Sequence, residues 1–193
     1  CPRPAGCVAG PRPYEAVLVG GAGPRRGDHR APEWGGDRAI VPGVEGVGVR
    51  NGQGAGGVNA RDPGFITHLR RLVSGEVRER EPLARWSTYR IGGPTTVLIP
   101  HAAEDVAVAL RVARDAGVPW MALGLGSNVL LPDEGVDALV IRLGNGLDGI
   151  RGEGERWTIG AGLPAPLAAR RTAEGGWSGL HKMVGVPGSV GGG

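Results

Sequence analysis

A glycine-rich loop with two short polar side chains is the part of this 193-residue sequence best suited to chemistry. Residues 124–131 read GLGSNVLL, so that Ser127 and Asn128 follow directly after Gly124 and Gly126. Glycine permits positive φ and lets the backbone come close to a ligand, and consecutive N–H groups in such a turn bind anions. The loop is therefore a candidate cradle for a phosphate-bearing cofactor. The alternative is a tight glycine turn with the asparagine in the left-handed conformation.

Two more glycine-rich stretches occur downstream. GAG at 160–162 ends an apolar, strand-like run, and GVPGSVGGG covers 185–193. In the second stretch, Val186 and Pro187 can lie against a flat ring. Three glycine-rich turns that follow apolar strands could together line the binding site of a long cofactor. For 185–193 the alternative is a flexible segment.

An earlier glycine motif does not support a nucleotide site. VLVGGAGPRRG at 17–27 contains Gly21 and Gly23 as G-x-G, but the next glycine comes one position too late for G-x-G-x-x-G. Pro24 would also interrupt the helix whose amino end must hold the phosphate. We interpret this motif as a chance similarity in a glycine-rich segment.

The other reactive side chains are not spaced in the sequence as a metal site or a catalytic site would require. The histidines lack the spacing of metal ligands, and they are His29, His68, His101 and His181. The nucleophile motif G-x-S-x-G is absent. Arg85 and Arg90 flank the start of a strand, where either could meet phosphate or simply face solvent. The sequence thus predicts no metal, and spacing assigns no catalytic residue.

Composition excludes several classes of function. A net charge of +3 is too small to favour a nucleic-acid partner. Cys1 and Cys7 lie too close together to staple a domain and cannot complete a zinc site. No apolar run is long enough for a membrane span. We therefore expect a cytoplasmic protein with neither a membrane nor a nucleic-acid partner. Because the chain begins with cysteine, we also expect a fragment at this end.

The amino-acid composition of the chain changes near residue 64. Glycine and proline make up more than a third of residues 1–64, a level typical of low-complexity segments. We predict that residues 1–64 are a disordered extension and that residues 65–193 form the folded domain.

The folded part alternates helical and strand-like segments. The clearest helix is 104–116, where Val106, Ala109, Leu110 and Ala113 share one face and Gly117 can end the helix. Further helices are expected at 65–73 and 166–174, and strands at 95–100, 119–124, 138–143 and 156–162. This order is typical of an α+β or α/β domain.

Five motifs in order resemble one bacterial enzyme family. They are LARWSTYRIGGP (83–94), GLGSNVLL (124–131), VIRLGNGLDGI (140–150), IGAGLP (159–164) and GLHKMVGVPGSVGG (179–192). Over residues 67–193 the chain resembles the UDP-N-acetylenolpyruvoylglucosamine reductases, also called UDP-N-acetylmuramate dehydrogenases or the MurB family.

The resemblance implies an α+β FAD-binding domain of the vanillyl-alcohol-oxidase (PCMH) type, truncated at its C-terminus, with the flavin between two subdomains. It implies that the 124–128 loop binds the FAD pyrophosphate through backbone N–H groups, and that the other two glycine-rich segments line the rest of the flavin. The implied cofactor-binding residues are Leu123, Gly124, Leu125, Gly126, Ser127, Asn128, Gly160, Ala161, Gly162, Val186, Pro187, Gly188, Ser189, Gly191 and Gly192.

The family's chemistry is likewise an implication of the resemblance. NADPH reduces FAD, which passes hydride to UDP-N-acetylglucosamine enolpyruvate in the synthesis of the peptidoglycan precursor UDP-N-acetylmuramate. A serine protonates the enol, and an arginine and a glutamate stabilise it. These three residues would lie beyond Gly193, so we expect a fragment without turnover. We also expect a monomer. Another FAD-linked oxidase or dehydrogenase of the same fold, and a fragment that does not bind flavin, remain alternatives.

Two positions depart from the family pattern. Tyr89 and Arg90 form a Tyr-Arg dipeptide, but in the wrong motif, so the family arginine's role is not transferred to Arg90. His181 stands where the family often has an acidic residue, which leaves that contact open.

Overall fold

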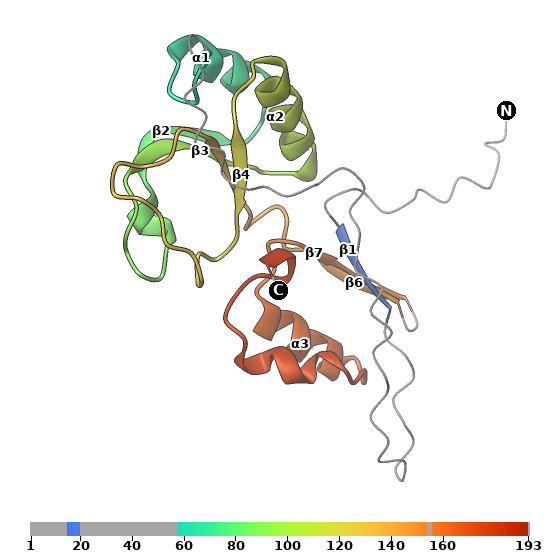
Figure 1. Cartoon of the computed structure of the whole chain (residues 1–193). Helices are drawn as coiled ribbons and strands as arrows, with labels where there is room; N and C mark the ends of the chain where they lie inside the picture. Colours follow the sequence, from blue (N-terminus) through green and yellow to red (C-terminus); the bar gives the residue numbers. More distant parts are fainter. Residues whose placement is uncertain (1–14, 20–57, 154–155, 193) are drawn as a thin grey trace, which may run out of the picture.

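A four-stranded sheet forms the centre of the larger body in the computed structural model, which describes residues 15–19, 58–153 and 156–192 (Figure 1). Strand β2 (Glu76–Pro82) lies at one edge and runs antiparallel to β3 (Pro94–Ile99). Strands β3 and β4 (Trp120–Leu123) both run parallel to β5 (Leu139–Arg142), which lies between them. The three parallel strands therefore end at the same edge of the sheet.

Helices α1 (Pro63–Leu72) and α2 (Ala103–Asp115) cover one face of this sheet. The Asp62 carboxylate accepts the N–H of Phe65 at 2.9 Å and so caps α1. Gly117, at φ 66°, follows the end of α2, as its spacing predicted. The apolar sides of both helices meet alternate strand residues in one core, whose members include Phe65, Leu69, Leu98, Ala109, Ala113, Leu139 and Ile141.

The opposite face of the sheet is covered by irregular chain. Parallel neighbours such as β4 and β5 need a crossover connection, and residues 124–138 supply it without a helix. The second core lies beneath this connection and the short 3-10 helix η1 (Leu83–Trp86), and contains Leu83, Val97, Leu123, Leu131, Val136, Ala138 and Val140. The crossover loop that carries the glycine motif is therefore fixed by buried residues at 131–138.

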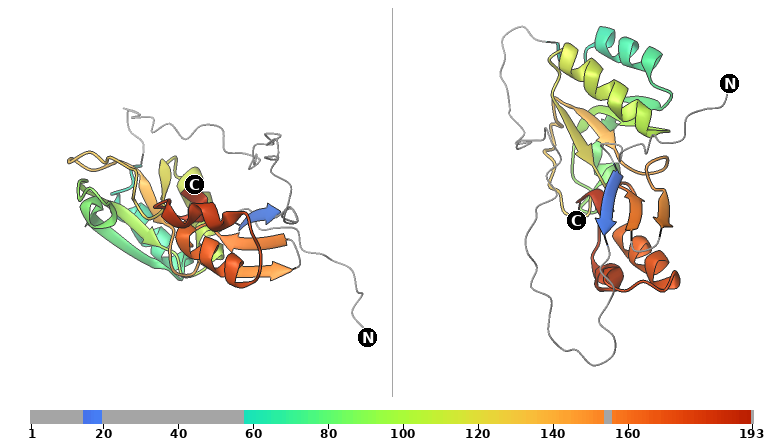
Figure 2. Two further views of the ribbon diagram at one scale, coloured as in Figure 1. Left: turned by 90° about the horizontal axis from the view of Figure 1, so that it is seen from below. Right: turned by 90° about the vertical axis from the view of Figure 1, so that its right-hand side faces the viewer.

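A smaller antiparallel sheet forms the second body. Its order is β1 (Glu15–Val19), β7 (Arg156–Gly160) and β6 (Ile150–Glu153). Helix α3 (Ala165–Glu174) follows β7 and packs near it around a core of Ile159, Leu163 and Ala168. The two views of Figure 2 show this sheet and α3 beside the carboxyl-terminal segment.

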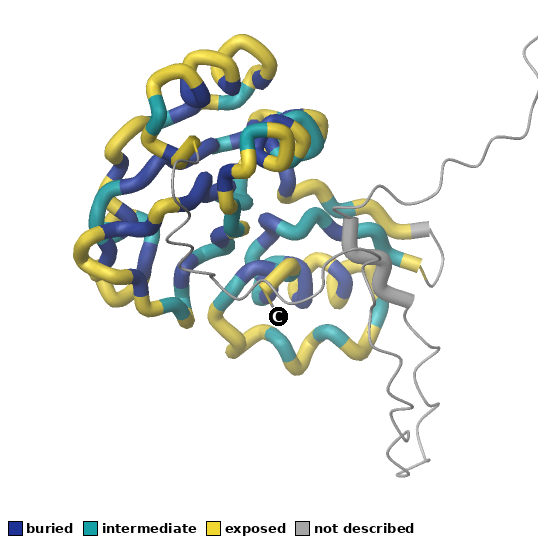
Figure 3. The backbone as a smooth tube through the Cα atoms, turned by 45° about the horizontal axis from the view of Figure 1, so that its top comes forward, coloured by how far each residue is buried: buried dark blue, intermediate teal, exposed yellow. Residues whose placement is uncertain are grey.

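The carboxyl-terminal segment contains two short 3-10 helices, η2 (Leu180–Gly185) and η3 (Val190–Gly192). Figure 3 shows that burial concentrates on the strands and on the inner turns of the helices, whereas much of the chain around η2 is exposed. The expectation that all three glycine-rich turns follow strands is wrong for 185–193, because this stretch follows η2.

The structure confirms the expected helices and strands in the part of the chain that it describes, and the α+β class. Strands β1, β2 and β6 were not predicted. Ala60 is fully buried and its carbonyl accepts the Thr96 hydroxyl at 2.6 Å, so residues before 65 join the core. Strand β1 lies within 1–64, while the motif at 20–27 falls outside the described residues. No described helix is both long and apolar enough to cross a membrane.

Candidate cofactor-binding site

The glycine loop begins where β4 ends, at the edge where all three parallel strands finish. Leu123, the last residue of β4, is buried, and its carbonyl accepts the N–H of Leu143 at 2.8 Å. Ligands of open sheets with parallel strands bind outside the carboxyl ends of those strands. The chain therefore presents Gly124–Asn128 at the edge where a ligand is expected.

Gly126 is required by its surroundings. It has φ 67°, and a Cβ there would lie 1.9 Å from the carbonyl oxygen of Trp86. Its own carbonyl accepts the N–H of Thr88 at 2.9 Å. The alternative turn with Asn128 in the left-handed conformation is wrong, because Arg80 and Arg90 are the non-glycine residues described with positive φ. The loop is thus shaped by Gly126 and tied to residues 86–88.

The loop meets the third glycine-rich segment directly. The Ser127 hydroxyl donates to the carbonyl of Pro187 at 3.2 Å. A Cβ on Gly124 would lie 2.4 Å from the Ser189 Oγ, although 60 or more residues separate the two segments. Ser189 is only 2% exposed. Its hydroxyl makes no hydrogen bond with any described residue, and its Oγ occupies the space beside Gly124 that a side chain would need.

The same segment also reaches the second glycine stretch. Gly191 donates its N–H to the carbonyl of Ala161 at 2.9 Å, and Val190 donates to Leu163 at 2.8 Å. Gly162 lies against Gly144 so closely that a Cβ would approach the backbone to 2.7 Å. Gly160 approaches the Leu147 carbonyl in the same way. The structure therefore brings all three predicted segments together, with 187–192 in the middle.

Residues around this junction range from buried to exposed. Leu123, Gly126, Gly162 and Ser189 are buried, and Leu125 is half-buried. Exposed residues of the predicted set are Asn128, Val186, Pro187, Gly191 and Gly192. Leu130, next to the loop, is 77% exposed. The junction thus carries a polar backbone cradle with exposed apolar side chains at its rim.

Arg142, at the end of β5, lies beside this junction and was not among the residues predicted from the sequence. Its guanidinium Cζ lies 5.4 Å from the centroid of the Trp86 ring. Its Nη1 donates to the carbonyl of Leu143 and, at 3.5 Å, to that of Leu123. Its Nε is buried without a partner. Burial lowers the pKa of Arg142 below its ordinary value. In the sequence, the signal that could have identified Arg142 is its single charge in the otherwise apolar run ALVIRL (138–143).

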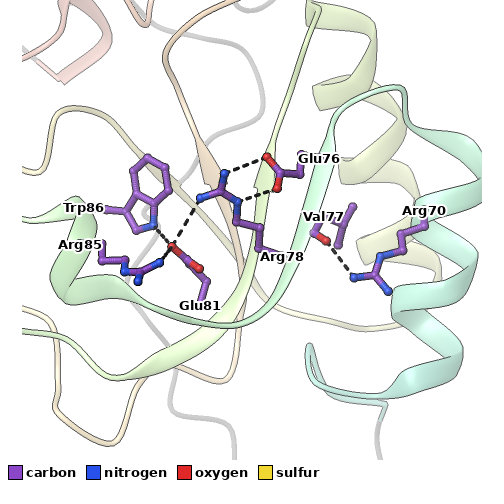
Figure 4. Close-up of polar contacts among 7 residues, drawn as sticks. All are labelled: Arg70, Glu76, Val77, Arg78, Glu81, Arg85 and Trp86. Carbon is purple, nitrogen blue, oxygen red and sulfur yellow. Dashed lines mark hydrogen bonds and ion pairs between the residues drawn. The ribbon is translucent and has the colours of Figure 1, made fainter.

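Trp86 is held by the charged edge strand (Figure 4). Its Nε1 donates to Oε1 of the buried Glu81 at 3.1 Å. Arg78 lies over the same indole with Cζ 5.6 Å from its centroid, and its Nη1 is 3.6 Å from Glu81. Arg78 also pairs with Glu76, and this hydrogen bond lowers the pKa of the exposed Glu76 carboxyl. The network fixes the ring that Arg142 covers.

Arg85 and Arg90, the two cations that the sequence analysis considered for a phosphate, are both exposed. Arg85 has a 70% exposed side chain and an Nη1 3.7 Å from Glu81, and Arg90 is exposed with φ 56°. Both line an open cavity of about 620 Å³ with Ala84, Ser87 and Thr88. His181 is exposed, and its Nδ1 accepts the N–H of Gly179 at 3.1 Å. The histidine therefore shapes its own turn.

A second cavity lies between the bodies. It measures about 360 Å³ and extends from the amino end of α2 to the smaller sheet, where Gly160 is one of its lining residues. Gly146, which also lines this cavity, packs directly against the backbone of His101, since a Cβ there would lie 2.2 Å from the His101 carbonyl oxygen. One end of the second glycine stretch therefore faces open space.

The fold and this junction define an α+β ligand-binding domain with a glycine cradle at the ends of its parallel strands. Residues 94–193, more than half of the chain, match the family model described as FAD binding domain. The chain belongs to this FAD-binding family, which confirms the fold class predicted from the sequence.

Curated relatives agree with the family resemblance. The UDP-N-acetylenolpyruvoylglucosamine reductase of Bacillus licheniformis is 44% identical over 128 residues, which cover 66% of this chain and 42% of the relative. The corresponding reductases of Bacillus subtilis and Caulobacter vibrioides are each 42% identical, over 66% and 61% of this chain and 42% and 40% of the relatives. The chain thus spans about two fifths of the length of the curated relatives it matches.

One solved structure is similar as well. The crystal structure of UDP-N-acetylenolpyruvylglucosamine reductase (MurB) from Thermus caldophilus is 33% identical, with a TM-score of 0.47, over 61% of this chain and 41% of that chain.

Proposed function

We propose that this chain is the FAD-binding part of a UDP-N-acetylenolpyruvoylglucosamine reductase. In that reaction NADPH is the reductant, and a UDP-sugar enolpyruvyl ether is the substrate, reduced to UDP-N-acetylmuramate for peptidoglycan in the cytoplasm. The contact of Ser189 with Gly124 carries the proposal, because it joins the loop to the third glycine-rich segment of the predicted site.

The chain's residues fit a flavin dinucleotide. The Ser189 hydroxyl, which has no partner among the described residues, fills the space beside Gly124 that a Cβ would need, so it is an available donor next to the loop. Arg142 adds a cation with an orphaned, buried Nε. A diphosphate needs such donors. The exposed side chains of Val186 and Pro187 at the rim suit a flat, apolar ring.

The proposed role of each segment follows from its position. Residues Leu123–Asn128 would hold the pyrophosphate through backbone N–H groups, with Ser127 able to exchange its bond to Pro187 for a phosphate oxygen. Gly160–Gly162 and Val186–Gly192 would flank the remainder, the ring included. Bound FAD supplies the hydride chemistry, while the chain orients it. The proton donor and enol-stabilising groups of the family have no assigned counterpart in residues 1–193.

The test is flavin binding by the purified 193-residue chain. We expect yellow protein, or uptake of added FAD followed by quenching or anisotropy of flavin fluorescence, with micromolar affinity or tighter. Protein that stays colourless and takes up no added FAD would contradict the proposal.

Turnover is a separate measurement. With NADPH and the enolpyruvyl sugar nucleotide, we expect this polypeptide alone to oxidise NADPH no faster than a free-FAD blank. Turnover clearly above that blank would show that residues 1–193 supply a proton donor and would overturn the expectation.

A further inference from the structure

Arg142 is a half-buried cation whose charge is not neutralised by the chain around it. No carboxylate of the described residues lies within ion-pair distance of its guanidinium. Taking a charged group out of water without a counter-charge is costly. Stacking on Trp86 offsets part of this cost. An anion that completes the pair is therefore the expected partner.

The Nε–Nη2 edge of the Arg142 guanidinium makes no hydrogen bond within the described residues. Nη1 carries both bonds, to the carbonyls of Leu123 and Leu143. Nε has no partner, and Nη2 makes no hydrogen bond to any described residue. The Nε–Nη2 edge is a planar pair of donors of the kind that binds phosphate oxygens in a bidentate manner.

The position of Arg142 selects which anion this is. Its bond to Leu123 places the guanidinium at the last residue of β4, directly before the glycine loop. The ring beneath it belongs to Trp86, whose carbonyl lies under Gly126. Arg142, Trp86 and the loop are therefore joined by contacts, and a phosphate held by the backbone of the loop would lie beside them.

We propose that Arg142 binds a phosphate of the dinucleotide through its Nε–Nη2 edge, and that Trp86 and Glu81 are positioning residues that hold the guanidinium there. The inference rests on the proposed FAD function. It adds to the backbone cradle a side chain that recognises the diphosphate and distinguishes FAD from flavins without one.

The test compares Arg142→Gln with wild type for FAD, riboflavin and ADP, with binding followed by flavin fluorescence and by competition. We expect Arg142→Gln to weaken FAD and ADP at least tenfold and to leave riboflavin affinity within about twofold. Arg142→Lys should recover part of the loss, because it restores charge without the fork. Arg111→Gln, at an exposed arginine of α2 outside this network, is the matched control and should bind FAD within about twofold of wild type.

Trp86→Phe tests positioning. It keeps a ring but loses the Nε1 bond to Glu81, so FAD should weaken less than in Arg142→Gln while riboflavin stays unchanged. An equal loss of FAD and riboflavin in Arg142→Gln, or no loss of either, would overturn the inference. Failure of the wild-type chain to bind FAD would instead reject the proposed function.

If Arg142→Gln does not fold, as judged by circular dichroism, a measurement on the wild-type protein tests the same proposal. Arginine modification by phenylglyoxal is mapped by mass spectrometry with and without nucleotide. Protection of Arg142 by ADP but not by adenosine supports the inference, whereas equal modification under both conditions contradicts it.

Discussion

Two glycines of this chain share a backbone conformation but not an environment. Gly126 has φ 67° and Gly117 has φ 66°. A Cβ on Gly126 would lie 1.9 Å from the Trp86 carbonyl, whereas one on Gly117 would meet nothing within 4 Å. The pair therefore separates the cost of the left-handed conformation, about 1–2 kcal/mol for a side chain, from the cost of a steric clash in the candidate site.

We predict that Gly117→Ala lowers the melting temperature by about 2–4 °C, as expected for about 1 kcal/mol in a chain of this size. Gly126→Ala should lower it at least twice as much and weaken FAD binding as well, because the Trp86 backbone must move away from the loop. Thermal melting and FAD titration of both variants check this. Equal effects of the two substitutions on stability and on FAD affinity would show that the close approach is unimportant.

At the scale of single residues, the sequence predicted where glycines matter but not what they touch. The pattern GLGSN identified the loop, and its glycines were assigned to ligand contact. For Gly126 the close neighbour is the chain's own Trp86, which lies 40 positions earlier. Arg142 was missed because its orphaned donor exists only once β5 lies beside β4.

At the scale of elements, the amino end of α2 depends on one buried carboxylate. Asp105 is 4% exposed. It accepts the N–H of Ser74 at 2.6 Å, of His101 at 2.8 Å and of Ala102 at 3.3 Å. It thus joins α2 to the turn between α1 and β2, where Gly75 leaves no room for a side chain. Burial alone would raise the pKa of Asp105, but these hydrogen bonds outweigh it and lower the pKa.

The sign of the resulting pH dependence follows from the lowered pKa. A carboxyl whose pKa is lower in the folded state stabilises the fold above its unfolded pKa, near 3.9. That contribution is lost as the pH falls through the folded value. We predict that Asp105→Asn costs about 1–3 kcal/mol at pH 7 and that the difference from wild type shrinks below pH 4.

Urea unfolding of both proteins between pH 3 and pH 7 measures this dependence. Asp115→Asn, at the exposed end of the same helix, is the matched control and should stay within about 0.5 kcal/mol of wild type. A difference between Asp105→Asn and wild type that does not change with pH would show that the carboxylate charge is irrelevant.

The elements also show which physical signals a sequence carries. Helix α2 was predicted because its apolar residues repeat with helical spacing and a glycine ends it. Strand β2, EVREREP, has a single apolar residue, Val77, because it is an edge strand on which every charged side chain except Glu81 is at least partly exposed. Its bulge, with Arg80 at φ 50°, disturbs the alternation further. Such a strand is fixed by pairing with β3 and not by its own pattern.

At the scale of the whole molecule, the candidate site lies where the two bodies meet through backbone and small residues. Ser127 bonds to Pro187, Gly162 lies against Gly144, and Ser189 occupies the space beside Gly124. A cofactor that binds across these contacts to the folded state alone should stabilise the fold, by about 2.7 kcal/mol at 100 times its dissociation constant.

We predict that the rise in melting temperature with saturating FAD depends on the contact between Gly124 and Ser189. Gly124→Ala places a Cβ 2.4 Å from the Ser189 Oγ and should push residues 187–192 away from the loop. The variant should then lose about tenfold in FAD affinity and most of the thermal shift. Ser189→Ala removes the clashing oxygen, so the double variant should bind FAD more tightly than Gly124→Ala alone.

The double-mutant cycle is decisive because residues in contact couple, whereas independent sites add within about 0.5 kcal/mol. A cofactor seated between the loop and residues 187–192 requires coupling of the two substitutions in FAD affinity. Additive losses would mean that FAD does not sense this contact and binds elsewhere. Ser178→Ala, at an exposed serine before η2, controls for removal of a hydroxyl from the same body and should leave the FAD-dependent shift at the wild-type value.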